Sequence, residues 1–316
     1  TSTRFNFTSG TLTLNTDASI TNATGSGGNA HTIALSPDIS GPTRTLTLDK
    51  SGNGTGFLIS GATASSIDLA GLTVGAGSRL YISSDANIDA LSQIKSNGGG
   101  LTMNSGATLQ YRADVTAPGP VFDPSVMSWQ GNNTLSFSRD TAGNRDSYMQ
   151  ISSNLTVSTA AGLTQLNAIP WRAYLTIASP YVLTVGDGGT LQWTAGSQVR
   201  EEVKGNMTFL DGATIVGVNS NPGGIIRDTT GGGTLTLGDG SAATVTIQGN
   251  HGTDPDSFNL GWPAANVTDS GNVTMRYANT SATAGEYFNV GWSDGGTYNA
   301  ALTAFRETSG GTEFSP

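Results

Sequence analysis

The carboxylates and histidines of this chain are the residues whose types could support acid–base or metal chemistry. Glycoside hydrolysis needs two carboxylates that flank the scissile bond. Three pairs lie close in sequence: Asp254 with Asp256, Glu201 with Glu202, and Asp140 with Asp146. Adjacent residues of a strand point to opposite faces, so Glu201 and Glu202 would not converge. Asp254-Pro-Asp256 lies in a turn-like stretch, where aspartates more often hydrogen-bond to the backbone. We therefore expect no catalytic pair.

Metal chemistry is equally weakly supported. His31 and His251 are the only histidines, and there is no cysteine, so a three-ligand zinc site would need carboxylates. His251 lies near Asp254 and Asp256, and these three residues are the one cluster with metal or acid–base character. Gly186–Gly188 and Gly238–Gly240 read Gly-Asp-Gly but lack the Gly-Gly-x-Gly-x-Asp spacing of calcium-binding solenoids. We expect these segments to form corners, and we expect no metal, no cofactor and no enzymatic activity.

Aromatic residues offer surfaces for sugar stacking or self-association. Trp193 alternates in step with Leu191, so we expect it in the core. Towards the end of the chain a short repeat occurs twice, as Phe258-Asn-Leu-Gly-Trp262 and Phe288-Asn-Val-Gly-Trp292. Its tryptophans stand beside glycine in expected loops, which favours contact roles. The candidate assembly residues of this region are Phe258, Trp262, Phe288 and Trp292.

The elements that would position these residues follow a degenerate repeat. An apolar–Thr–apolar triplet leads through two or three turn residues into a second apolar alternation. The clearest triplets start at Leu12, Leu72, Leu101, Leu183, Met207 and Leu235, and weaker ones at Leu46, Leu135, Leu155, Leu175 and Val273. Most successive starts lie about 20 to 34 residues apart, and this variation favours a β-helix, whose turns vary in length, over a propeller.

The triplet predicts a short strand with two apolar side chains on one face and Thr on the other. Such a strand cannot bury its apolar face alone, but coils stacked about 4.8 Å apart bury it continuously. Glycines in the turns supply the positive φ that sharp corners need. The sequence therefore predicts an all-β fold, a β-solenoid of the parallel β-helix type.

Several segments are expected to depart from the coils. Asp85–Lys95 spaces Ile and Leu three apart and predicts one short side helix, and Thr164–Ile169 is a weaker helix candidate. Ala113–Gly131 contains three prolines and predicts a long ordered loop excursion. We divide the chain into a solenoid over residues 1–250 and a region of terminal coils or a small cap over residues 251–316.

Composition excludes several classes of protein. The formal charge is −9 with three lysines, so a nucleic-acid binder with a basic stripe is excluded. No apolar run reaches the length of a membrane span. Charged residues are 12% of the 316 residues, about half the usual share, and Thr, Ser, Asn and Gly take the polar positions. The chain starts at Thr1 without Met, which we interpret as a mature secreted or cell-surface form or as a trimmed piece.

The LTVGDG and LTLGDG turns followed by Thr-Leu-x-Tyr/Trp strands resemble autotransporter-associated β-strand repeats and other Gly/Thr/Asn-rich exported proteins of bacteria. The triplets at Leu12, Leu72, Leu101, Leu183 and Leu235 carry this resemblance. It implies a right-handed β-helix and an extracellular or surface location. Right-handed β-helices also include polysaccharide lyases and phage tailspikes, so a polysaccharide-binding or polysaccharide-degrading role stays open, as does that of an adhesin.

The leading hypothesis is a non-enzymatic structural protein that assembles with copies of itself into a filament or surface layer. Thr3–Thr8 reads as a strand with Phe5 and Phe7 on one face, available for addition to a neighbouring copy. The alternative is that this segment forms the first coil of its own solenoid.

Overall fold

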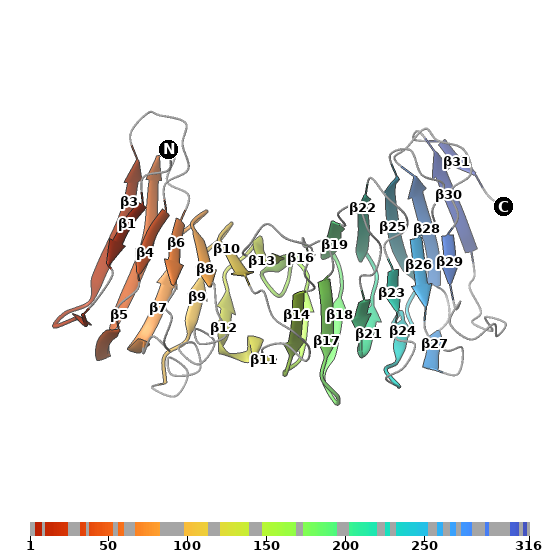
Figure 1. Ribbon diagram of the computed structural model, residues 1–316. Helices are drawn as coiled ribbons and strands as arrows, with labels where there is room; N and C mark the ends of the chain where they lie inside the picture. Colours follow the sequence, from red (N-terminus) through yellow and green to blue (C-terminus); the bar gives the residue numbers. More distant parts are fainter. Residues whose placement is uncertain are drawn as a thin grey trace. The chain divides into compact units, whose positions relative to one another are not determined.

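The computed structural model contains strands and connecting turns throughout the residues that it describes (Figure 1). These residues are 4–7, 10–24, 32–35, 38–52, 56–59, 67–82, 98–112, 121–138, 147–168, 173–194, 202–219, 225–227, 232–251, 258–261, 266–269, 273–279, 288–290, 304–309 and 312–314. They form two compact units, Thr1–Asp114 with Asp123–Thr141 and Val115–Phe122 with Ala142–Pro316. Each unit is described by itself below.

Unit 1 consists of two sheets of parallel strands. The β8 sheet has the order β1-β4-β6-β8-β10-β13, and the β7 sheet has the order β12-β9-β7-β5-β2 with β3 also paired to β5. The β8 sheet contains β1 (Arg4–Phe7), β4 (Thr32–Leu35), β6 (Gly56–Ile59), β8 (Arg79–Ile82), β10 (Thr108–Arg112) and β13 (Asn133–Ser138). The β7 sheet contains β2 (Leu12–Thr13), β3 (Ala18–Thr24), β5 (Ile39–Gly52), β7 (Ile67–Val74), β9 (Leu101–Met103) and β12 (Met127–Trp129).

Unit 2 adds further strands on each coil, so its described strands lie in four sheets. The β22 sheet contains β16 (Leu163–Ala168), β19 (Thr190–Thr194), β22 (Thr214–Asn219), β25 (Ala243–His251), β28 (Val273–Asn279), β30 (Ala304–Ser309) and β31 (Thr312–Phe314). The β18 sheet contains β15 (Leu155–Val157), β18 (Val182–Val185), β21 (Asn206–Phe209), β24 (Leu235–Leu237) and β27 (Val267–Asp269). The β17 sheet contains β11 (Val121–Phe122), β14 (Ser147–Ile151), β17 (Ala173–Ile177) and β20 (Glu202–Lys204). The β26 sheet contains β23 (Ile225–Arg227), β26 (Phe258–Gly261) and β29 (Phe288–Val290).

The predicted parallel β-solenoid is confirmed by these pairings. Every strand pair described in these sheets is parallel except β30 with β31, which is antiparallel. Parallel neighbours that are separated by a full coil of the chain are the defining feature of a solenoid. No helix among the described ranges is long and apolar enough to cross a membrane. The handedness of the coil stays a prediction.

The apolar–Thr–apolar triplet behaves as the sequence predicts. In the β18 sheet Leu183 pairs with Met207, Met207 pairs with Leu235, and all three side chains are fully buried. The residue that follows each of them is a threonine on the opposite face. Register aligns these residues into the threonine ladder of the β18 sheet: Thr156, Thr184, Thr208, Thr236 and Thr268. Threonine packs well beside threonine and adds no charge repulsion between coils.

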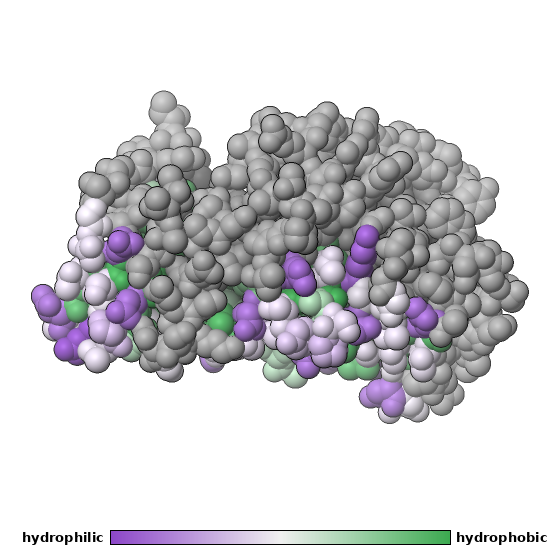
Figure 2. Space-filling view, turned by 60° about the horizontal axis from the view of Figure 1, so that its bottom comes forward, coloured by the Kyte–Doolittle hydropathy of each residue, from purple (hydrophilic) through white to green (hydrophobic). Residues whose placement is uncertain are grey.

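Unit 1 carries an equivalent row on the β7 sheet. Leu46, Leu72 and Leu101 pair in register and are buried, and the hydroxyl residues between the apolar positions line up on the other face. This hydroxyl ladder consists of Ser19, Thr47, Thr73, Thr102 and Ser128. The described part of the surface in Figure 2 accordingly mixes white and purple atoms with small separate green areas.

The weaker copies of the repeat do not all belong to the same column. Leu46 and Leu155 lie in the β7 and β18 sheets with the clear copies, but Leu135 pairs with Leu109 in the β8 sheet. Leu175 lies in the β17 sheet and Val273 in the β22 sheet. Each coil buries more than one strand, so the same short pattern occurs in strands of different sheets. The pattern therefore cannot identify the sheet to which a given triplet belongs.

The corner turns use glycine where the triplets predict it. Gly188 of the Gly-Asp-Gly turn has φ +66°, and a Cβ there would overlap the hydroxyl of Thr159 on the preceding coil. Polar side chains also stabilise corners by bridging coils. Asn133 is fully buried, accepts a hydrogen bond from the N–H of Ala107 (3.0 Å) and donates one to the carbonyl of Met103 (3.1 Å).

Two expectations from the sequence are wrong. Residues 164–168 belong to strand β16 and not to a helix, because parallel pairing aligns Leu166 with Leu191. Leu163 and Leu166 are both buried, and their spacing of three residues resembles that of a helix. Leu163 is the first residue of the strand and also forms an isolated antiparallel bridge with Ser158.

The second half of Ala113–Gly131 is not an excursion. Its residues 121–129 form β11, a short 3-10 helix (Pro124–Val126) and β12, and both strands pair with the solenoid sheets. The prolines suggested a loop, but Pro124 lies at the start of the 3-10 helix, where proline is tolerated.

Other expectations stay predictions. The side helix over Asp85–Lys95 lies outside the described residues. The boundary at residue 251 is not tested, although β26, β27 and β28 continue the parallel pairing of the strands before them.

Candidate functional site

The candidate assembly strand at the start of the chain is part of its own solenoid. Strand β1 pairs in parallel with β4, and Phe5 and Phe7 lie opposite Ile33 and Leu35. This is the alternative that the sequence left open. In the part of the chain that the structure describes, β1 is paired on this side only, so its other edge is the end of the β8 sheet.

The repeat near the end of the chain occupies equal positions on successive coils. Strands β26 and β29 pair so that Phe258 lies opposite Phe288 and Leu260 opposite Val290. The strand portion of the repeat is therefore a solenoid repeat, and its sequence similarity follows from its similar structural position. Trp262 and Trp292 lie outside the described residues.

The candidate catalytic residues are mostly outside the described ranges. Glu202 lies on β20 and His251 is the last residue of β25. Asp140, Asp146, Glu201, Asp254, Asp256 and His31 are outside the described residues. Among the residues that the structure does describe, no group of three or more His, Asp or Glu could hold a metal ion. Asp239 of the second Gly-Asp-Gly turn accepts a hydrogen bond from the N–H of Ser241 (2.9 Å), as a turn aspartate does.

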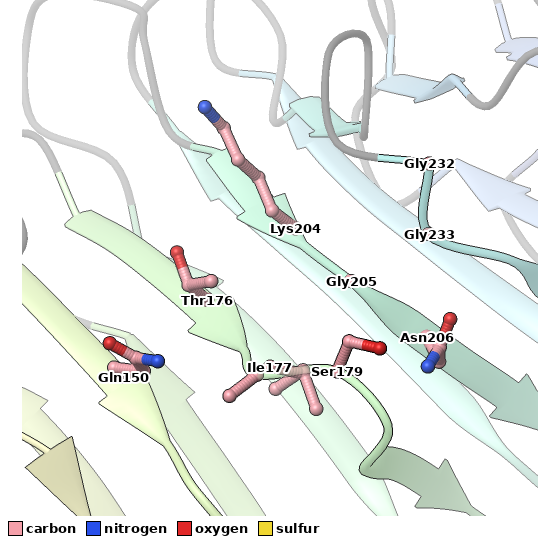
Figure 3. A pocket seen from close by; sticks show the side chains of 10 residues that line it. Gln150, Thr176, Ile177, Ser179, Lys204, Gly205, Asn206, Gly232 and Gly233 are labelled. Atoms are coloured by element: carbon pink, nitrogen blue, oxygen red, sulfur yellow. The ribbon is translucent and has the colours of Figure 1, made fainter.

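Among the residues that the structure describes, a groove in unit 2 is the candidate ligand site (Figure 3). It has a volume of about 390 Å³ and lies where the β17 sheet turns into the β18 sheet. Its lining residues are Gln150, Thr176, Ile177, Ala178, Ser179, Lys204, Gly205, Asn206, Gly232 and Gly233. These residues come from four successive coils, so the groove follows the direction in which the coils stack.

One wall of the groove is a column of three polar residues. Register places Gln150 opposite Thr176, and Thr176 opposite Lys204. Ile151 and Ile177, the residues that follow the first two, are buried, so the column faces outward by the alternation of the strand. Figure 3 shows the three side chains on neighbouring strands.

The other wall is fixed by hydrogen bonds of Asn206 at the corner between the sheets. Its amide nitrogen donates to the carbonyl of Tyr181 (3.1 Å), and its amide oxygen accepts from the N–H (3.1 Å) and hydroxyl (3.2 Å) of Thr234. These bonds join the coil of Asn206 to the coils on both sides. The shape of this corner is therefore determined by the backbone positions of three coils.

Sequence reasoning did not identify this groove. Gln150, Thr176 and Lys204 follow different neighbours in sequence and share no motif. The one available signal was that Lys204 is one of three lysines in an acidic chain. Their alignment depends on the lengths of the intervening coils, which only the pairing of strands reveals.

Comparisons with known proteins add no identity to these observations. No protein-family model matches the chain, and no curated protein matches it.

Proposed function

We propose that this chain is a non-enzymatic extracellular structural protein whose copies associate end to end into a filament or a surface layer. The observation that carries the proposal is the parallel pairing that recurs from coil to coil. In such a stack, the strand added next has the same backbone partners and the same inward and outward faces as the strand before it.

The proposed contact is the edge of β1 that has no partner strand among the described residues. An edge strand presents unpaired N–H and carbonyl groups that bind a strand of another chain. Phe5 and Phe7 lie on alternate positions of this strand, in register with Ile33 and Leu35 of β4. A joining strand would therefore meet the same alternation that β4 presents to β1.

The extracellular location is supported by composition and by the resemblance of the turns to bacterial exported repeats. Thr, Ser, Asn and Gly replace charged residues at most polar positions. The hydroxyl ladders themselves carry no charge and therefore add no local repulsion between copies.

Deletion of the first strand would be a weak test, because it would expose β4 as a new edge. A proline scan over Arg4, Phe5, Asn6 and Phe7 is sharper. Successive N–H groups of a strand point to opposite sides, so prolines at two alternate positions remove N–H groups from the open edge. Those two variants should lose assembly in negative-stain electron microscopy and light scattering, with a small change in melting temperature.

The other two prolines remove N–H groups that face β4 and serve as the internal control. They should lower the melting temperature and affect assembly less. A wild-type protein that stays monomeric over a wide concentration range would overturn the proposal, as would four proline variants that assemble like the wild type.

A further inference from the structure

The groove of unit 2 is suited to a ligand that side chains recognise, and not to a peptide strand. Strand β17 is paired with β14 on one side and with β20 on the other, so its backbone groups are already used within the sheet. A peptide that binds by strand addition needs an unpaired edge. A ligand that lies over β17 must therefore bind side chains of the Gln150–Thr176–Lys204 column and of the corner beside it.

The arrangement of those side chains fits an extended polyhydroxylated chain. Neighbouring strands lie about 4.8 Å apart, so the amide of Gln150, the hydroxyl of Thr176 and the ammonium of Lys204 are offered at regular intervals along the groove. Amide and hydroxyl groups both donate and accept hydrogen bonds, as sugar hydroxyls do. Ala178 and the exposed Ser179 provide small side chains at the corner, where a ring can lie close to the backbone.

The charges of the groove and of the whole protein determine which polyhydroxylated chains fit. Among the described residues that line the groove, Lys204 is the only charged one, and the chain as a whole carries a formal charge of −9. A densely charged polymer such as a nucleic acid would be repelled by the whole molecule. A polysaccharide in which neutral sugars separate the acidic ones would bring one carboxylate to Lys204 with little added repulsion.

We propose that this groove binds an extended polysaccharide with widely spaced carboxylate groups. Lys204 pairs with one carboxylate, and Thr176 and Gln150 hydrogen-bond to hydroxyl groups of the sugars beside it. The inference does not depend on end-to-end assembly, because the groove lies on β14, β17, β20 and the corner beside them in unit 2, and not on strand β1.

Titration calorimetry with a matched pair of oligosaccharides tests the proposal on the full chain. A hyaluronan hexasaccharide alternates acidic and neutral sugars, and chitohexaose is a neutral counterpart. The wild type should bind the hyaluronan fragment more tightly. Lys204→Gln should weaken that binding about tenfold, the size of one charge-assisted hydrogen bond, and should leave chitohexaose binding unchanged.

Three further variants separate the groove from general charge effects. Lys50→Gln removes the same charge from β5 of unit 1 and should have no effect on binding. Thr176→Val keeps the shape of the side chain and should weaken binding of both oligosaccharides. At Gly232 (φ +69°) a Cβ would meet no atom within 4 Å, and asparagine is among the residues that most readily adopt a positive φ, so Gly232→Asn should add a side chain to the groove at a small cost in stability and should weaken both.

The proposal is overturned if the wild type does not bind the hyaluronan fragment, or if it binds alginate or oligogalacturonate hexamers, in which every sugar is acidic, more tightly than hyaluronan. It is also overturned if Lys50→Gln reduces binding as much as Lys204→Gln, because the effect would then come from net charge. Unaltered filaments in the Lys204→Gln variant would show that the two proposals stand separately.

Discussion

At the scale of single residues, polar side chains at corners are as important to this fold as the apolar core. Asn133 bridges two coils from a fully buried position, whereas Asn154 makes a comparable bond to the N–H of Val182 (3.0 Å) from an exposed one. Water can replace a lost partner at the exposed corner but not at the buried one. The same residue type therefore contributes differently to stability at the two places.

Asn133→Ala should lower the free energy of unfolding by about 2 kcal/mol, because two buried hydrogen bonds are lost at roughly 1 kcal/mol each. The backbone N–H of Ala107 keeps its second acceptor, the carbonyl of Asn104, which limits the loss. Urea denaturation measures the change. Asn154→Ala is the control and should cost less than about 1 kcal/mol. Equal losses in the two variants would contradict this account of the buried corner.

At the scale of the elements, the threonine ladder of the β18 sheet shows how a strand with one solvent-facing side is stabilised. Its interior members are half-buried because threonines of the coils before and after cover them, while Thr156 and Thr268 at its two ends are exposed. A substitution in the interior of the ladder meets a neighbour on both sides. A substitution at an end meets a neighbour on one side within the described residues.

Thr208→Asp should lower the free energy of unfolding by about 1 kcal/mol, because it replaces a β-branched side chain by one that is unfavourable in strands. Thr208→Val keeps the branched shape and should change stability by less than about 0.5 kcal/mol. Thr268→Asp is the positional control and should cost less than Thr208→Asp. Thermal and urea unfolding measure all three variants, and a loss at Thr268 as large as that at Thr208 would exclude ladder packing as the cause.

At the scale of the whole molecule, a solenoid is stabilised mainly by contacts between neighbouring coils. Long-range cooperativity is consequently weaker than in a protein with one central core, and local damage spreads over a few coils. The two compact units of this chain each contain fully buried aromatic side chains, Phe57 in unit 1 and Phe209 in unit 2. These residues allow the range of coupling to be measured.

Phe209→Ala should cost about 4 kcal/mol locally, since it leaves a large cavity in the β18 sheet. Amide hydrogen exchange should lose protection in β18, β21 and β24 and retain it in β5, β7 and β9. Phe57→Ala is the reciprocal control and should reduce protection in unit 1. Uniform loss of protection across both units in either variant would show that the molecule unfolds as one cooperative body.

The sequence by itself determined the class of the fold, because strand pattern and turn chemistry are local properties. Leu183-Thr184-Val185 already shows which residues face inward and which face outward, and Gly188 already marks a corner. Each conclusion needs only the alternation of a strand or the conformational freedom of one residue. The structure confirms both at these positions.

Only the tertiary structure decided which strands lie side by side. Leu135 and Leu175 begin triplets like that of Leu183 but belong to other sheets, and residues 164–168 form a strand although their spacing resembles a helix. The candidate groove depends on the same information, because Gln150, Thr176 and Lys204 become neighbours only when each coil closes at its own length. Register between coils is a long-range property that is set by the burial of all the strands of a coil together, so no single segment of the sequence contains it.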